Sequence, residues 1–263
     1  MRSTLFSLLA VAAFVYVCFC LYLYLFQRSF IYFPTAVAEG VPADEVWIDN
    51  EQEKIRLWRL HPSRSDAIIY FGGNAEDVSY NTREFSDWFP QHAVYLVNYR
   101  GYGGSSGSPG EAAFYSDAQA VYDFVAGKHA AISLIGRSLG AAVAVHLATR
   151  REVERLVLVT PFDSLRSLAS EFYPIFPTSL LLKDTYDAVG LAGRVRAPAL
   201  VLVAEHDEII PRQSSERLAD ALGGQRVIRF IEGTGHNTIG TSPDYGRSLR
   251  EFMWPRTGRI TGR

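Results

Sequence analysis

Short apolar runs recur along the chain from about residue 45 onward. Examples are AIIYF at 67–71, AVYLVNY at 93–99 and ALVLVA at 199–204. Runs of this length with few polar positions are typical of strands buried on both faces of a parallel sheet. The expected strands cover residues 45–48, 55–60, 67–71, 93–98, 131–135, 155–159, 199–204 and 227–231.

Helical patterns lie between most of these strands, at residues 79–89, 111–127, 139–150, 213–222 and 242–254. This alternation predicts right-handed crossovers, and therefore a three-layer α/β fold with a mostly parallel central sheet. The first two strands follow each other without a helix, which predicts an antiparallel start. Ligands of such sheets bind beyond the carboxyl ends of the strands, so we expect the turns there to carry the chemistry.

The N-terminus has a different pattern. Residues 4–26, TLFSLLAVAAFVYVCFCLYLYLF, contain no charge in 23 positions. At about 1.5 Å per residue a helix of this length reaches about 34 Å, enough to cross the hydrocarbon core of a bilayer. Arg28 and a group of aromatic residues at the far end fit a membrane interface. The sequence predicts an anchor and interfacial segment at 1–33, followed by a catalytic domain at 34–263.

A cleaved signal peptide is the alternative interpretation of this segment. Ala36, Val37 and Ala38 supply a cleavage pattern, but the apolar run exceeds the usual core of about 7–15 residues and ends about ten residues earlier. These features favour an uncleaved anchor. Arg2 and the terminal amine lie on one side and Arg28 on the other, and the slight bias predicts a catalytic domain on the non-cytoplasmic side.

Composition narrows the class of protein. Apolar residues make up 48% of the 263 residues and the net charge is −2, which suits one large globular domain and gives no electrostatic footprint for nucleic acid. The two cysteines, Cys18 and Cys20, both lie in the apolar N-terminus. No disulfide or cysteine metal site is therefore expected in the remainder, and nothing suggests a metal or an organic cofactor.

The consensus Gly-x-Ser-x-Gly, which places the nucleophile in many hydrolases, occurs twice: GGSSG at 103–107 and GRSLG at 136–140. Ser138 follows the strand AISLIGR and precedes the small-residue helix LGAAVAVHLATR, as a nucleophile elbow requires. Ser105 lies in a long glycine-rich loop, and Ser-Gly-Ser-Pro-Gly after it excludes the start of a helix. We therefore expect Ser138 to be the nucleophile and Ser105 to be a turn residue.

A serine hydroxyl needs a base, normally a histidine oriented by a carboxylate, and the chain order in such sheets is serine, acid, histidine. Of the six histidines only His206 and His236 follow the elbow and its helix. His206 adjoins a strand, with too little chain before it to hold the acid. His236 follows the strand VIRFI in a glycine-flanked loop and is the expected base.

The acid is expected directly after the strand ALVLVAE, where Asp207 stands. Asp163, after the preceding strand, is the reserve candidate. Glu205 and Glu208 flank Asp207 and are interpreted as solvated or loop-bracing carboxylates.

Two backbone amides are needed to hold an oxyanion. One is expected from Leu139, the residue after the nucleophile, and the other from the loop FGGNAED at 71–77. Asn74 is the candidate donor in that loop, and Gly73 is the alternative.

With these motifs in place, the chain resembles the α/β-hydrolase superfamily, and within it the membrane-anchored branch of fungal bud-emergence hydrolases and mammalian protein depalmitoylases. The resemblance covers the apolar N-terminus, QRSFIYFPT, FGGNAED, NYRGYGGSSGSPGE, GRSLGAA, PFDSL, HDEIIP and GTGHN. It implies a serine hydrolase with Ser138, Asp207 and His236 as catalytic residues, acting on esters or thioesters. Relatives usually carry His-Gly-Asn where this chain has Gly72-Gly73-Asn74, so the bracing hydrogen bonds of that histidine must come from elsewhere.

The segment at 162–192 connects two strands and carries Phe172, Tyr173 and Phe176. It is expected either to form a small cap that binds an acyl chain or to be an ordinary helix packed on the sheet. Two other functions remain open alternatives to an esterase or thioesterase: a peptidase or amidase of the same fold, and a catalytically silent binding module. The expected partners are a small-molecule or acylated substrate and the lipid bilayer.

Overall fold

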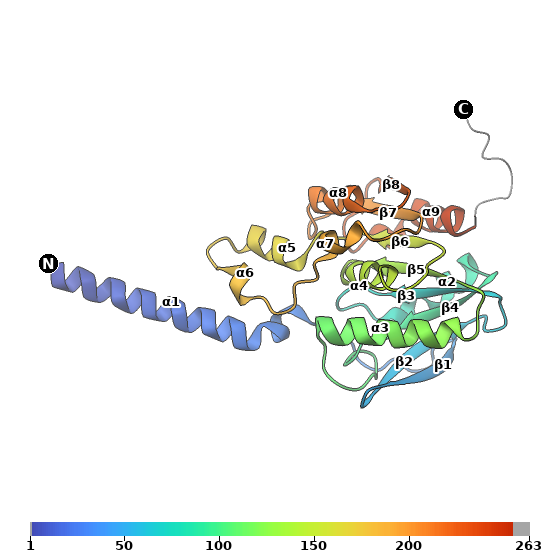
Figure 1. The fold of residues 1–263 in the computed structure, drawn as a ribbon, viewed down its shortest axis with the longest axis horizontal. Helices are drawn as coiled ribbons and strands as arrows, with labels where there is room; N and C mark the ends of the chain where they lie inside the picture. The colour runs from blue at the N-terminus through green and yellow to red at the C-terminus, as the bar shows by residue number, and fades with distance from the viewer. Residues whose placement is uncertain (1, 255–263) are drawn as a thin grey trace.

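The computed structural model describes residues 2–254 and is built around one eight-stranded sheet (Figure 1). The strand order is β1-β2-β4-β3-β5-β6-β7-β8; the β1–β2 and β2–β4 pairs are antiparallel and all others are parallel. This confirms the mostly parallel sheet and its antiparallel start. The strands are β1 (Asp44–Asn50), β2 (Glu53–Leu60), β3 (Asp66–Phe71), β4 (His92–Val97), β5 (Ala131–Arg137), β6 (Leu156–Val159), β7 (Ala199–Ala204) and β8 (Arg226–Ile231).

Helices cover both faces of this sheet and complete the three expected layers. Apolar residues of α3, α4, α7 and α8 form the core on one face, and those of η1, α2 and α9 form the core on the other. The helices are α1 (Arg2–Ile31), η1 (Val78–Asn81), α2 (Thr82–Trp88), α3 (Glu111–Ala126), α4 (Leu139–Ala148), α5 (Leu165–Phe172), α6 (Thr178–Leu181), α7 (Ala188–Ala192), α8 (Arg212–Ala221), η2 (Ile239–Thr241) and α9 (Pro243–Met253).

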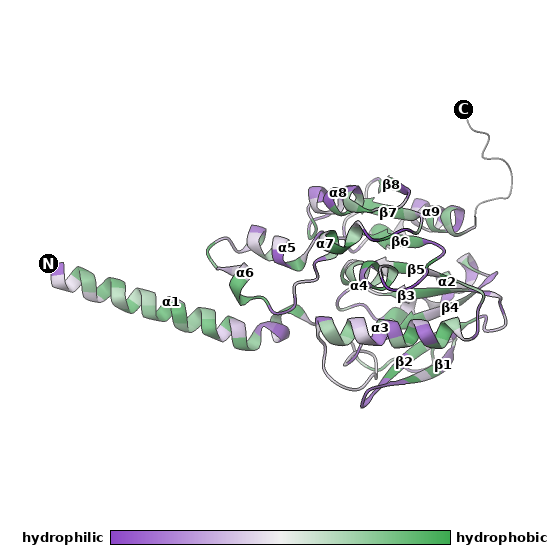
Figure 2. Ribbon diagram, viewed as in Figure 1, coloured by the Kyte–Doolittle hydropathy of each residue, from purple (hydrophilic) through white to green (hydrophobic). Residues whose placement is uncertain are grey.

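Helix α1 projects from the domain as a single rod of 30 residues (Figure 1). It is apolar along almost its whole length (Figure 2), and its most apolar window has a mean hydropathy of 2.4. Only 6% of that window is buried against the rest of the chain. By length and composition α1 is able to cross a membrane.

Helices α5 and α6 lie on the same side of the domain as α1, whereas α7 packs against α4 and α8 (Figure 1). We refer to residues 165–182, which contain α5 and α6, as the cap. Pro174 and Pro177 separate its two short helices, because proline lacks the amide proton that a continuous helix requires.

The turn between β5 and α4 is strained at one residue and crowded at two. Ser138 has φ 50° and ψ −112°, and its amide donates to the Val159 carbonyl at 2.8 Å. A Cβ on Gly136 would lie 2.3 Å from the Gly140 carbonyl oxygen, and one on Gly140 would lie 2.1 Å from the Phe71 carbonyl oxygen. The two glycines of GRSLG therefore allow α4 to start directly against the ends of β3 and β5.

Gly140→Ala is therefore expected to lower the free energy of unfolding by about 3 kcal/mol or more, because the atoms it meets are backbone and cannot rotate away. The matched control is Gly240→Ala, where a Cβ meets nothing within 4 Å and the expected change is under about 0.5 kcal/mol. Thermal unfolding followed by circular dichroism in detergent micelles measures both. Equal unfolding temperatures for the two variants would contradict this interpretation of the turn.

Candidate active site

The structure brings Ser138, His236 and Asp207 together at the carboxyl ends of β5, β8 and β7. Ser138 Oγ lies 3.1 Å from His236 Nε2, and His236 Nδ1 lies 2.9 Å from Asp207 Oδ2 and 3.1 Å from Oδ1. The side chains of His236 and Asp207 are 6% and 2% exposed. This geometry is a continuous hydrogen-bonded chain from a buried carboxylate to a serine hydroxyl, which is the arrangement that activates a nucleophile.

The loops that carry the acid and the base are held by hydrogen bonds to their backbone. Asp207 Oδ1 also accepts from the amides of Ile209 and Ile210 at 3.0 and 2.7 Å. The His236 amide donates to Glu208 Oε2 at 3.1 Å, and Glu205 accepts from the Gly233 amide at 2.8 Å. The two glutamates that flank Asp207 therefore brace the histidine loop, which is one of the two interpretations that the sequence left open.

Asp163, the reserve acid, belongs to a different network. It accepts from the Ser164 amide, from Ser214 Oγ and from Arg217 Nε at 2.7 to 2.8 Å. Burial raises the pKa of the Asp163 carboxyl, but these hydrogen bonds lower it by more, so the pKa lies below its ordinary value. Asp163 joins the turn after β6 to α8 and does not contact His236.

Ser105, the serine of the other Gly-x-Ser-x-Gly consensus, bonds to backbone groups of neighbouring segments. Ser105 is buried, and its Oγ accepts from the Arg56 amide at 2.9 Å and donates to the Asn98 carbonyl at 2.8 Å. These bonds fasten the glycine-rich loop to β2. The side chain of His206, the other histidine after the elbow, is 71% exposed and lies beside Glu205.

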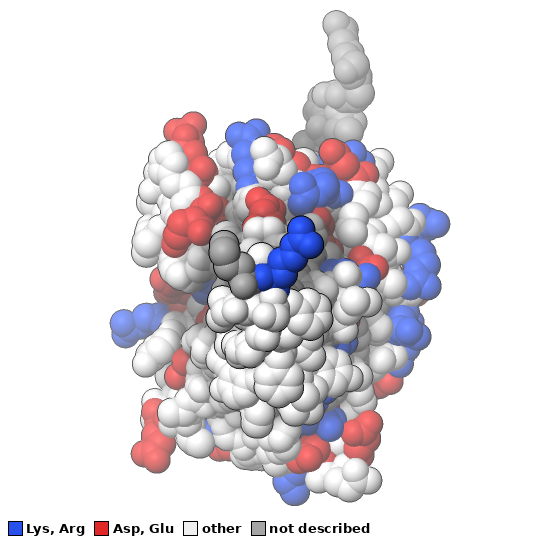
Figure 3. Space-filling model, turned by 90° about the vertical axis from the view of Figure 1, so that its left-hand side faces the viewer, with Lys and Arg blue, Asp and Glu red and all other residues white. Residues whose placement is uncertain are grey.

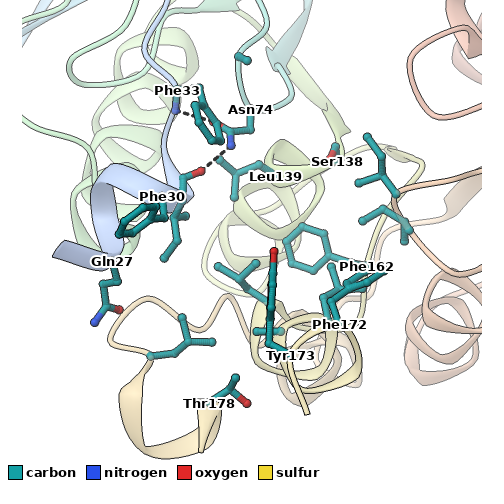
Figure 4. A pocket seen from close by; sticks show the side chains of 18 of the residues that line it. Gln27, Phe30, Phe33, Asn74, Ser138, Leu139, Phe162, Phe172, Tyr173 and Thr178 are labelled. Carbon is teal, nitrogen blue, oxygen red and sulfur yellow. Dashed lines mark hydrogen bonds between the residues drawn. The ribbon is translucent and has the colours of Figure 1, made fainter. Parts of the chain in front are cut away.

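The loop after β3 lies against Ser138, since a Cβ on Gly73 would stand 3.7 Å from the Cβ of Ser138. The Gly73 amide already donates to Glu76 Oε2 at 2.6 Å, so this alternative oxyanion donor is occupied. Within residues 2–254, the Asn74 and Leu139 amides have no acceptor, and both residues line the cavity next to Ser138 (Figure 4). The geometry therefore favours this pair over Gly73.

Glu76 is the site residue that sequence reasoning missed. Its Oε2 accepts from the Gly73 amide and from Arg137 Nη1 at 3.1 Å, and its Oε1 accepts from Tyr70 at 2.6 Å and from Asn81 at 2.7 Å. Burial and the Glu76 charge raise the pKa of the Tyr70 hydroxyl well above its usual value, which keeps it a donor.

Through these four hydrogen bonds the Glu76 carboxylate braces the loop after β3. Arg137 extends the connection, since its Nη2 donates to the His236 carbonyl at 3.2 Å. Through its salt bridge to Glu76 and its hydrogen bond to the His236 carbonyl, Arg137 thus links the loop after β3, the elbow and the histidine loop. The only signal in the sequence was a glutamate three residues after Gly73, in a loop that lacks the usual histidine.

The side chain of Asn74 also forms hydrogen bonds with the end of α1 and the residues after it, which its sequence position did not indicate. Its Nδ2 donates to the Ile31 carbonyl at 2.6 Å, and its Oδ1 accepts from the Phe33 amide at 3.1 Å and from the Tyr102 hydroxyl at 2.7 Å (Figure 4). Burial raises the pKa of Tyr102 to about 12, so this hydroxyl stays protonated as a donor. The oxyanion loop is thereby tied directly to the end of α1.

A cavity of about 980 Å³ opens from Ser138 (Figure 4). Phe172, Tyr173 and Phe176 of the cap line it. The opposite wall comes from α1, which contributes Phe19, Leu23, Gln27, Phe30 and Ile31. The cavity therefore lies between the cap and the N-terminal helix, with Ser138 at one end.

A mostly parallel three-layer sandwich with a serine elbow, an acid and a histidine at the carboxyl strand ends defines an α/β hydrolase. Comparison with known proteins agrees. The model of the alpha/beta hydrolase family matches residues 79–189. The uncharacterized protein Rv2307c of Mycobacterium tuberculosis is 36% identical over 226 residues, which cover 80% of each chain. The chain belongs to the alpha/beta hydrolase family.

Two further similarities concern proteins with named activities. Lysophosphatidylserine lipase ABHD12 of Macaca fascicularis is 29% identical over 249 residues, which cover 81% of this chain and 62% of that protein. The esterase Pf2001 of Pyrococcus furiosus superposes with a TM-score of 0.68 at 17% identity, covering 84% of this chain and 95% of the esterase. The second similarity concerns the fold alone.

Proposed function

We propose that this protein is a membrane-anchored serine hydrolase that cleaves carboxylic esters or thioesters of acyl chains. The observation that carries the proposal is the hydrogen-bonded chain from Asp207 through His236 to Ser138 at the end of an apolar cavity. Apolar pockets with a few convergent polar groups are typical binding sites for small molecules. The similarity to a lysophosphatidylserine lipase supports an acylated substrate.

The reaction follows from the positions of these groups. His236 Nε2 removes the proton from Ser138 Oγ as that oxygen attacks the acyl carbonyl carbon, and the amides of Leu139 and Asn74 hold the resulting oxyanion. Collapse breaks the bond to the alcohol or thiol, which leaves with the proton from His236, and an acyl-enzyme remains. Water that His236 deprotonates then attacks the acyl-enzyme, and the acid and free Ser138 are released. Asp207 orients the imidazole and stabilises its positive charge.

A panel of 4-nitrophenyl esters, a thioester and an anilide of one acyl chain tests the type of bond. We expect the ester and the thioester to be hydrolysed with similar kcat/KM. The anilide is expected to react at least about 10²-fold more slowly, a difference of about 3 kcal/mol in activation free energy. Faster cleavage of the anilide would favour the peptidase or amidase alternative, and no cleavage together with no labelling by a serine-directed probe would favour a silent binding module.

The anchor is proposed to be retained. Tyr32 is 3% exposed within the main core, and its hydroxyl bonds to both Asp184 and Tyr186. Cleavage after Ala38 would remove this residue and the two backbone partners of Asn74. We accordingly assign residues 1–33 to the anchor and its interfacial segment and 34–263 to the catalytic domain. The slight charge bias between Arg2 with the terminal amine on one side and Arg28 on the other supports a catalytic domain on the non-cytoplasmic side. Mass spectrometry of the membrane-extracted protein tests the retention of the anchor, because a chain that begins after Ala38 would contradict it.

Glu76→Ala is expected to lower kcat by about 10²-fold with little change in KM, because the oxyanion loop loses four hydrogen bonds that fix it next to Ser138. Glu76→Gln keeps one acceptor oxygen, so its kcat is expected to fall less than that of Glu76→Ala. Asp77→Asn is the control, since Asp77 caps η1 through the Ser79 amide and bonds to none of these groups. Steady-state kinetics on one ester checks all three, and an unchanged kcat for Glu76→Ala would contradict the bracing role.

A further inference from the structure

The tip of the cap is attached to α1 at a level within its apolar run. The Tyr16 hydroxyl donates to the Ile175 carbonyl at 2.7 Å. The ring of Phe176 stacks on Tyr16 with centroids 6.0 Å apart and lies 5.6 Å from Phe19. These contacts fix the depth of the cap relative to the helix.

That depth places the cap tip inside the lipid if α1 crosses the membrane. The uncharged run covers residues 4–26, whereas a core of about 30 Å takes about 20 residues, so its domain-side boundary falls between Leu23 and Phe26. Phe19 then lies about 6 to 10 Å inside the core and Tyr16 about 10 to 15 Å inside, at about 1.5 Å per residue. Ile175 and Phe176 lie at the same depth.

The composition of the cap suits this position. Residues 172–182 carry no charge between Glu171 and Lys183, and four large apolar side chains are more than half exposed: Phe172, Tyr173, Ile175 and Leu180. Seen from the N-terminal end of α1, uncharged side chains fill much of the centre of the view, and charged side chains of both signs surround them (Figure 3). An apolar patch of this kind that is continuous with a membrane span fits a lipid surface.

Backbone polar groups of the cap also find partners that lipid would not supply. Besides the bond from Tyr16, the Leu181 carbonyl accepts from Gln27 Nε2 at 2.9 Å, and the amide of Lys183, the first residue after the cap, donates to Gln27 Oε1 at 2.7 Å. Gln27 is 7% exposed, and it fastens the base of the cap to α1 where the apolar run ends.

The catalytic end of the cavity lies just beyond that boundary. Arg28 pairs with Asp184 at 2.9 Å and Lys183 lies over the Tyr24 ring, which places charged groups at the interface. One turn further along, Ile31 and Phe33 hold Asn74, and with it the loop next to Ser138. The reactive serine is therefore at headgroup depth, where the ester bonds of membrane amphiphiles lie.

We propose that the cavity takes its substrate sideways from the bilayer. The acyl chain of a membrane-resident ester or thioester enters between α1 and the cap and lies along Phe19, Leu23 and Phe30, while its carbonyl reaches Ser138. The distance along α1 from Phe30 to Phe19 is about 16 Å, which accommodates a long chain. The membrane helix is thus a wall of the binding site as well as an anchor. This inference rests on the proposed hydrolase function.

Leu23→Trp tests the entry route, with Leu25→Trp as its matched control. Leu23 lines the cavity, whereas Leu25 is 59% exposed on the same helix and does not. The full-length protein is reconstituted in phosphatidylcholine vesicles and assayed with 4-nitrophenyl palmitate in the bilayer and with 4-nitrophenyl butyrate in solution. Leu23→Trp is expected to lower kcat/KM for the palmitate ester by about 10-fold or more and for the butyrate ester by less than about 2-fold.

Leu25→Trp is expected to leave both values within about 2-fold of the wild type. Equal palmitate rates in the two variants, with butyrate turnover intact, would overturn the entry route while leaving the hydrolase function in place. No turnover of either ester by the wild type would instead overturn the proposed function. The two failures are therefore distinguishable.

Cap depth is tested separately, with variants that need no substrate. Ile175→Trp in vesicles whose acyl chains are brominated near their middle is expected to lose most of the emission that the added tryptophan contributes. Val227→Trp, at an exposed site on β8, is expected to keep its added emission. Equal quenching at the two sites, or none at residue 175, would overturn the insertion of the cap.

Discussion

Ser138→Ala is expected to lower kcat/KM for an acyl ester by at least about 10⁴-fold, because the acyl-enzyme can no longer form. The residual activity of this variant is expected to come from the oxyanion donors and from substrate binding alone. The substitution removes one oxygen, whose described contact is with His236, so the unfolding temperature is expected to change little. Kinetics on a 4-nitrophenyl ester and a thermal scan of the same preparation measure both quantities.

Ser105→Ala is the matched control, since it changes the same residue type in the same consensus. It removes two buried hydrogen bonds of Oγ and is expected to cost about 1 to 3 kcal/mol of stability. Activity per folded molecule is expected to stay within about 3-fold of the wild type. A larger catalytic loss in Ser105→Ala than in Ser138→Ala would contradict the assignment of the nucleophile.

Asp207→Asn is expected to lower kcat by about 10⁴-fold while the protein stays folded. The amide oxygen can still accept from Ile209 and Ile210, but the amide nitrogen would face His236 Nδ1 as a second donor. The imidazole is then held in the wrong tautomer, and Nε2 no longer accepts the serine proton. The measurement is kcat as a function of pH, beside circular dichroism of the folded state.

Asp163→Asn provides the comparison for this carboxylate. The substitution weakens the bond from Arg217 and the network with Ser214, so we expect it to lower the free energy of unfolding. Activity per folded molecule is expected to stay within about 3-fold of the wild type. A catalytic loss in Asp163→Asn equal to that in Asp207→Asn would contradict the choice of acid.

Much of the fold could be predicted because its signals are local. The eight predicted runs correspond to the eight strands. The central strands β3, β4, β6 and β7 gave the clearest signal because almost every residue in them is buried, whereas β1 and β8 at the sheet edges are largely exposed. Ser138 stood out because a strand, a crowded turn and a small-residue helix follow one another within a few residues. The chain order then restricted the acid and the base, and the structure places Asp207 and His236 within hydrogen-bond distance of each other.

Contacts between distant segments could not be predicted in the same way. Glu76 gathers donors from β3, from the elbow and from its own loop, and Arg137 is 61 residues away from it. The cap meets α1 through pairs such as Tyr16 and Ile175, which are 159 residues apart. Neither partner has a distinctive sequence signal of its own, so only the assembled structure shows that α1 forms a wall of the cavity.

The most direct test of the central claim is labelling of the detergent-solubilised full-length protein with a fluorophosphonate probe, followed by identification of the modified peptide. The account predicts one phosphonylated residue, Ser138, with labelling lost in Ser138→Ala and in His236→Ala and retained in Ser105→Ala. Folded wild-type protein that takes up no probe, or a label on Ser105, would contradict it.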